Sequence, residues 1–178
     1  KLGPALAAGC TTVLKPASET PLTALAVADI LHRAGCPKGV VNCILPVPTG
    51  PSIARLLADP RVRNVSFTGS TEVGKGLLKA CADRVLRTSM ELGGNAPFVV
   101  LDDADVDAAV QGAMIAKMRN GGAACTAANR FYVARAAVEA FTAKLATAFE
   151  ALVMGPGVGA GCQLGASVSV KEQIGRAH

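Results

Sequence analysis

Residues 64–92 are NVSFTGSTEVGKGLLKACADRVLRTSMEL, a helical segment between two stretches rich in β-branched residues. The pattern predicts a strand over 64–69, a helix over 70–83 and a second strand over 85–92. Two strands joined by such a helix form a βαβ unit, whose strands run parallel. The segment therefore predicts an α/β protein in which helices flank a mainly parallel sheet.

The same alternation continues toward the N-terminus. Thr20 is the expected N-cap of one helix, Pro21 fits its first helical position, and Gly35 fits its C-terminal stop. This helix is apolar almost all round, so we expect it to be well buried. The elements expected here are strands over 10–16 and 40–45 and helices over 20–35 and 51–59.

The sequence GGN at 93–95 interrupts the pattern. Beyond it we expect strands over 96–101 and 129–134, helices over 103–120 and 136–153, and a further helix in the last residues, 170–178. We interpret the interruption as a domain boundary. Residues 1–92 would then form one α/β domain and residues 93–178 would begin a second.

Composition narrows the class of protein. The chain has 178 residues, of which 51% are hydrophobic, enough for a sizeable core. The net charge is +5, but the basic residues are dispersed and there is no Trp, which argues against nucleic-acid binding. Diffuse positive charge also suits an anionic cofactor or substrate. We expect a cytoplasmic protein, because no apolar run reaches the length of a membrane span and no secretory signal is visible.

The six cysteines show no C-x-x-C pair and no metal-ligand spacing. We interpret them as reduced thiols, most of them small buried hydrophobic residues, and expect no metal site. Cys125 stands apart, because it follows NGGAA at 120–124 and so has little bulk around it. From this stretch alone, a structural cysteine in a tight turn and a reactive thiol are equally good interpretations.

Four stretches carry a resemblance to a known family: KPASETP at 15–21, FTGSTEVG at 67–74, MELGGNAPF at 90–98 and RNGGAACTAANR at 119–130. In this order they resemble the aldehyde dehydrogenase superfamily, with most similarity to succinate-semialdehyde dehydrogenases. The resemblance implies a partial aldehyde dehydrogenase fold, with a Rossmann-like cofactor-binding domain in residues 1–92 and the start of the catalytic domain in 93–178. It also implies a middle segment of a homo-oligomeric enzyme, without the family's upstream oxyanion asparagine.

The resemblance implies two catalytic residues. Cys125 would add to the aldehyde as a thiolate, because hydride leaves readily only once the carbonyl carbon has become a thiohemiacetal. Glu91, at the end of a strand, would be the general base that activates the water for thioester hydrolysis. Without the resemblance, a solvated glutamate at a strand end is the better interpretation of Glu91.

The resemblance also implies a dinucleotide site. Gly69 and Ser70 would approach the pyrophosphate at a helix N-terminus, and Leu92 would contact the cofactor. Lys15 and Ser18 would lie near the adenosine ribose, where a serine beside a lysine favours the 2′-phosphate of NADP. Glu19 is one position further on, and its carboxylate leaves NAD as an alternative cofactor.

Arg119, six residues before Cys125, bears on the substrate. The resemblance implies that it binds the distal carboxylate of succinate semialdehyde, which suits a guanidinium fork. An arginine that stabilises the end of a helix is the structural alternative. Ala127 stands where many relatives carry a second cysteine, and Ala123 where the family has a larger residue.

Three alternatives remain open at this stage. The chain could belong to another non-acylating aldehyde dehydrogenase, such as one for glutarate semialdehyde. It could instead be a cysteine-based redox protein, although no resolving cysteine lies near Cys125 in sequence. It could also be a catalytically inactive segment.

Overall fold

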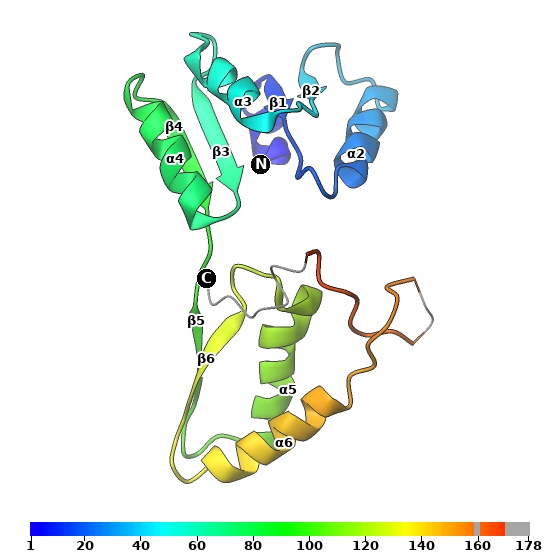
Figure 1. The fold of residues 1–178 in the computed structure, drawn as a ribbon, viewed down its shortest axis with the longest axis vertical. Coiled ribbons are helices and arrows are strands. Elements are labelled where there is room, and N and C mark those ends of the chain that lie inside the picture. The colour runs from blue at the N-terminus through cyan, green and yellow to red at the C-terminus, as the bar shows by residue number, and fades with distance from the viewer. Residues whose placement is uncertain (159–160, 170–178) are drawn as a thin grey trace. The chain divides into compact units, whose positions relative to one another are not determined.

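The computed structural model describes residues 1–158 and 161–169, and in them helices and strands alternate as expected (Figure 1). The helix predicted over 170–178 lies outside the described residues. The helices are α1 (Leu2–Ala7), α2 (Leu22–Arg33), α3 (Thr49–Ala58), α4 (Thr71–Ala82), α5 (Val106–Met118), the 3-10 turn η1 (Arg119–Gly122) and α6 (Val138–Glu150). The strands are β1 (Thr12–Leu14), β2 (Val41–Cys43), β3 (Asn64–Thr68), β4 (Arg87–Glu91), β5 (Ala96–Val100) and β6 (Ala128–Val133).

The strands join in three pairs, β1 with β2, β3 with β4 and β5 with β6. The first and third pairs are parallel. In each of the three pairs a helix connects the two strands: α2, α4 and α5, respectively. This confirms the predicted α/β class. Within the described residues the pairs are hydrogen-bonded separately, so the sheet expected in residues 1–92 is present as two two-stranded pieces, and β5 with β6 forms a third.

Helix α2 corrects two details of the sequence analysis. Its C-terminus is as predicted, because Gly35 has φ +86° and the N–H of Cys36 donates to Leu31 O, as in a Schellman motif. Its N-cap is Pro21 rather than Thr20, and no side chain caps the helix.

The expected burial of α2 is wrong in this structure. Ile30 is 54% exposed and Leu22 77% exposed, and none of the helix residues is buried. The physical reason is the small size of the surface beside it. The helix packs mainly on β2, and a strand of three residues covers little of a helix that is apolar all round.

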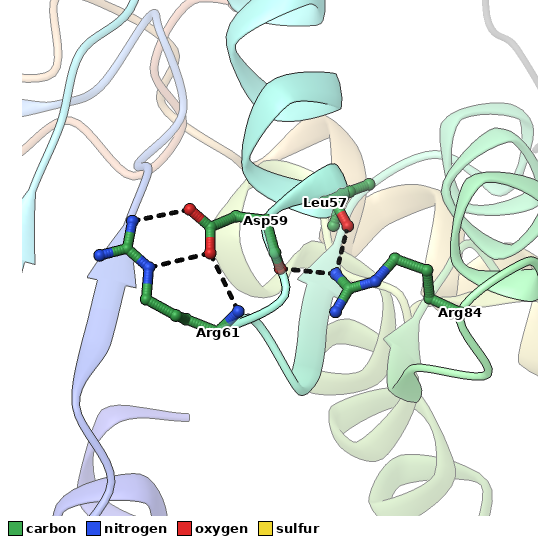
Figure 2. A network of polar contacts seen from close by, with 4 residues as sticks. All are labelled: Leu57, Asp59, Arg61 and Arg84. Atoms are coloured by element: carbon green, nitrogen blue, oxygen red, sulfur yellow. Dashed lines mark hydrogen bonds and ion pairs between the residues drawn. The ribbon is translucent and has the colours of Figure 1, made fainter.

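A polar network fixes the loop after α3 (Figure 2). Arg84 donates from Nη1 to Leu57 O at 2.8 Å and to Asp59 O at 2.6 Å, so a cation satisfies carbonyls at the C-terminal end of α3. Arg61 donates from its backbone N and its guanidinium to the Asp59 carboxylate, and these bonds hold the pKa of Asp59 well below its usual range. The network ties the segment after α4 to the end of α3.

The most continuous core lies around β5, β6, α5 and α6. Helices α5 and α6 lie on the same side of the β5–β6 pair (Figure 1). Phe141 is 2% exposed, and its ring centroid lies 6.4 Å from that of Phe98 and 6.2 Å from that of Phe131. Asp105 caps α5 by accepting from the N–H groups of Asp107 and Ala108.

The chain divides into two compact units, residues 1–68 with 72–90, and residues 69–71 with 91–178. The change at Met90 and Glu91 lies next to the interruption at GGN, and the functional assignment of residues 1–92 and 93–178 stays a prediction. Among the described residues, no helix has both the length and the apolar character needed to cross a membrane.

Candidate active site

Cys125 lies at the tip of a tight turn between η1 and β6, which we call the cysteine turn, residues 123–127. The N–H of Ala127 donates to Ala124 O at 3.0 Å and closes the turn. Ala127 and Ala128 are each 2% exposed, whereas Cys125 is exposed. The turn is therefore anchored in the core on its C-terminal side, and it presents its thiol at the surface of the unit.

The sequence NGG before the turn has a backbone requirement. Asn120, Gly121 and Gly122 have φ of 56°, 64° and 79°, so three consecutive residues adopt the left-handed region. Glycine and asparagine tolerate this conformation best. A Cβ on Gly122 would also lie 3.3 Å from Lys117 O. The residues that leave space around the thiol are thus also those that permit the sharp reversal after α5.

A second loop packs directly on the cysteine turn. We call it the glycine loop, residues 92–95, which joins β4 to β5. A Cβ built on Gly94 would lie 2.7 Å from the carbonyl oxygen of Cys125, closer than real Cβ atoms approach. The structure thus brings together two of the four stretches that carry the family resemblance.

Glu91 and Gly69 meet at the ends of their strands. The N–H of Gly69 donates to Glu91 O at 3.0 Å, just after β3 and at the last residue of β4. The side chain of Glu91 is exposed. Gly69, Ser70 and Thr71 are exposed too, at the N-terminus of α4. Ligand sites of α/β proteins commonly lie at the carboxyl ends of the strands, where these exposed residues stand.

Arg119 lies beside the cysteine turn. Its Nη2 donates to Thr126 Oγ1 at 3.4 Å, and the rest of the side chain is exposed. The contact places the guanidinium next to the residue that follows Cys125. It is compatible with both interpretations of Arg119, as a ligand for an anionic substrate and as a support for the turn.

The remaining residues proposed to bind the cofactor are Leu92, Lys15 and Ser18. Leu92 is half-buried in the glycine loop. Lys15 and Ser18 belong to the first unit, directly after β1, where Lys15 is half-buried and Ser18 exposed. Their assignment to the ribose of the cofactor stays a prediction.

The sequence analysis assigned no role to three residues that the structure connects to this site. They are Lys117, Asn129 and Arg130, which contact one another or the glycine loop. Asn129 and Arg130 stand within the stretch RNGGAACTAANR, immediately after the turn. Sequence offered no signal for their partners, because these partners are mostly backbone carbonyls on a loop 35 residues away.

Comparison with known proteins places the chain in a family. The profile of the Aldehyde dehydrogenase family matches residues 1–176. The chain is 51% identical over 171 residues to a glutarate-semialdehyde dehydrogenase of Pseudomonas aeruginosa, covering 96% of the chain and 35% of that protein. It is 49% identical over 174 residues to an NADP(+) succinate-semialdehyde dehydrogenase of Escherichia coli, with the same coverage.

Solved structures agree with this placement. The chain matches the crystal structure of an E. coli NADP-dependent enzyme with a TM-score of 0.93 and 49% identity, over 96% of the chain and 35% of that structure. The chain thus spans about a third of the length of the relatives that it matches.

We predict that Cys125 and Cys81 differ sharply in thiol reactivity. Cys81 is 2% exposed, and burial raises the pKa of its thiol, so little thiolate is accessible. Brief treatment with iodoacetamide followed by peptide mass spectrometry should label Cys125 and leave Cys81 unlabelled. In denaturant both should react. Equal labelling of the two in the native protein would contradict the packing of α4.

Proposed function

The chain belongs to the aldehyde dehydrogenase family, and on this premise we propose that it carries the catalytic cysteine and general base of an NAD(P)-dependent enzyme that oxidises an aldehyde to the acid. The observation that carries the proposal is the contact between the glycine loop, which follows Glu91, and the turn that presents Cys125. Two loops distant in sequence are thereby held together, as joint action of their side chains on one carbon requires.

Cys125 is the proposed nucleophile. Its thiolate forms a C–S bond to the aldehyde carbon, and the carbonyl electrons move to oxygen to give a thiohemiacetal. A bound nicotinamide would supply the hydride acceptor for this carbon, and Cys125 would then hold the product as a thioester. To the described residues the N–H of Cys125 donates no hydrogen bond, so it is available to the developing oxyanion.

Glu91 is the proposed general base for the second half of the reaction. Its carboxylate takes a proton from water as that water attacks the thioester, and the thiolate of Cys125 leaves with release of the acid. Support comes from its place at the carboxyl end of β4, with its backbone fixed by Gly69 and its side chain exposed. An exposed carboxylate on a fixed backbone can reach a water without displacing the loop.

We predict that Glu91→Gln uncouples the two half-reactions. In the full-length enzyme that contains residues 1–178, a burst of reduced cofactor should persist while steady-state turnover falls by about a hundredfold, in the usual range for loss of a general base. Stopped-flow absorbance of the reduced cofactor measures both phases.

Cys125→Ala is the matched control, because it should remove burst and turnover together and leave nucleotide binding intact. Substantial turnover by Cys125→Ala would refute Cys125 as the nucleophile. Loss of the burst in Glu91→Gln would show that Glu91 acts before deacylation or supports the fold.

NADP is the proposed cofactor, and the residues of this chain fit a dinucleotide. Helix α4 begins at Thr71, directly after exposed Gly69 and Ser70, so its positive dipole end lies beside the end of β3, where the proposal puts a phosphate. At the ribose position, exposed Ser18 beside Lys15 supplies a donor and a positive charge for a 2′-phosphate. The NADP named for the E. coli relative supports this choice.

We predict that Ser18→Glu shifts the preference from NADP toward NAD. A carboxylate repels the 2′-phosphate and accepts hydrogen bonds from free ribose hydroxyls. The ratio of kcat/KM for NADP to that for NAD should fall by at least about tenfold, the loss of one charge-assisted hydrogen bond. Ser70→Ala is a comparison, because a change at the pyrophosphate should affect both cofactors alike. An unchanged ratio in Ser18→Glu would remove the basis for assigning Ser18 to the ribose.

Succinate semialdehyde is the proposed substrate, and glutarate semialdehyde is the second candidate because a relative of similar identity is named for it. Both aldehydes carry a distal carboxylate. Arg119 is the proposed partner of that group, since its guanidinium lies beside the cysteine turn and makes a long hydrogen bond to Thr126. The two substrates differ by one methylene, so the length of the pocket rather than Arg119 would separate them.

We predict that Arg119→Ala removes most of the preference for a carboxylate-bearing aldehyde. The bond is charge-assisted, so kcat/KM for succinate semialdehyde should fall by about ten- to a hundredfold, with little change for an uncharged aldehyde of similar length. Arg119→Lys should recover only part, because an ammonium lacks the planar fork. Equal losses for both aldehydes would mean that Arg119 supports the turn through Thr126.

A further inference from the structure

We infer that Lys117, Asn129 and Arg130 are positioning residues that clamp the glycine loop against the cysteine turn and so set the place of the Cys125 thiol. The inference rests on the proposed function, since it matters for catalysis only if Cys125 is the nucleophile. It adds residues that touch neither the thiol nor, in the proposed mechanism, the substrate.

A β-bulge makes the clamp possible. In the parallel pair β5–β6, Ala96 is paired with Ala128 and Pro97 with Arg130, so Asn129 is an extra residue in β6. Consecutive side chains of a regular strand point to opposite faces. The bulge relaxes this alternation, and the neighbouring side chains of Asn129 and Arg130 both reach the glycine loop.

Arg130 is the strongest link. Its Nε and Nη2 donate to the single carbonyl oxygen of Asn95 at 3.1 and 2.7 Å, and its guanidinium also lies 5.9 Å from the centroid of the Tyr132 ring. Two charge-assisted bonds to one carbonyl and a cation–π contact fix the end of the glycine loop.

Asn129 and Lys117 form the second link. Asn129 donates from Nδ2 to Gly94 O at 3.5 Å, a long bond, while its Oδ1 accepts from Lys117 Nζ at 2.6 Å. The lysine therefore fixes the orientation of the amide and points its donor end at Gly94. Lys117 also lies in the last turn of α5, whose carbonyl at this residue faces Gly122. Lys117 thus approaches Gly122, just before the cysteine turn, with its carbonyl, and it binds Asn129, just after the turn, with its side chain.

Gly94 is where the clamp acts on the cysteine. Its backbone lies so close to the carbonyl of Cys125 that a Cβ would be 2.7 Å from that oxygen. Any shift of the glycine loop toward the turn would push this peptide group, and any shift away would leave the turn without its neighbour. The N–H proposed for the oxyanion and the thiol belong to the same residue, so both depend on this contact.

The test compares Arg130→Met, Lys117→Met and Asn129→Ala with Lys144→Met in the full-length enzyme. Lys144 is the control, because it lies on the surface of α6 and its side chain also donates one hydrogen bond to a side chain of this unit, that of Asp107. In the three clamp variants the burst rate of cofactor reduction should fall by about ten- to a hundredfold, because small displacements of a reacting group cost that much. The KM values for aldehyde and nucleotide should stay within about twofold.

Two further readouts separate positioning from a general structural role. Lys117→Arg, which keeps a cationic donor, should restore part of the burst rate. The rate of Cys125 alkylation by iodoacetamide should change in Lys117→Met and Asn129→Ala, and not in Lys144→Met. Alkylation needs no turnover, so it tests the clamp even if Cys125→Ala proves that another residue is the nucleophile.

Unchanged burst and alkylation rates in the clamp variants would overturn the inference. A loss of burst rate accompanied by equal losses in substrate affinity and thermal stability, without rescue by Lys117→Arg, would overturn it as well, because a residue that only supports the fold behaves in that way.

Discussion

The contact between the backbone of Gly94 and the carbonyl of Cys125 is the constraint on which the candidate site depends. A Cβ at position 94 would lie too close to this oxygen, so glycine is required there for lack of space and not for its backbone conformation. The neighbouring NGG at 120–122 is required for the opposite reason, since its residues adopt positive φ. Two glycine-rich stretches thus meet at one cysteine, each through a different property of glycine.

Local chemistry explains which parts of the fold could be predicted from the sequence. The positions of strands and helices follow from periodicity, and Gly35 ends its helix where a left-handed residue was expected. The N-cap was misplaced by one residue because Pro21 itself occupies that position. The burial of α2 was misjudged for another reason. An apolar pattern shows that a helix has surface to bury, but the neighbouring elements decide how much of that surface is covered.

The residues of the candidate site also differ in whether the sequence could predict their roles. Cys125, Glu91 and Arg119 could be identified by residue type and by family resemblance, because their proposed chemistry belongs to their own side chains. The roles of Asn129 and Arg130 could not, since they depend on a bulge that sequence periodicity does not show. Their partners are carbonyl oxygens, which every residue carries, so no sequence pattern marks which loop they will reach.

The use of carbonyl partners also bears on the excess of positive charge. Arg84 and Arg130 bind backbone oxygens of Leu57, Asp59 and Asn95 rather than carboxylates. A cation that binds a carbonyl has no carboxylate beside it, so the local field stays positive, whereas the two opposite charges of a salt bridge largely offset each other's field. With 18 basic and 13 acidic residues, the chain has more cations than carboxylates, and Arg84 and Arg130 bind backbone oxygens at loop ends. Such a field attracts anions without forming the continuous basic surface of a nucleic-acid-binding protein. Part of the dispersed positive charge seen in the sequence thus secures loop ends, and the excess suits the anionic cofactor and substrate proposed for the site.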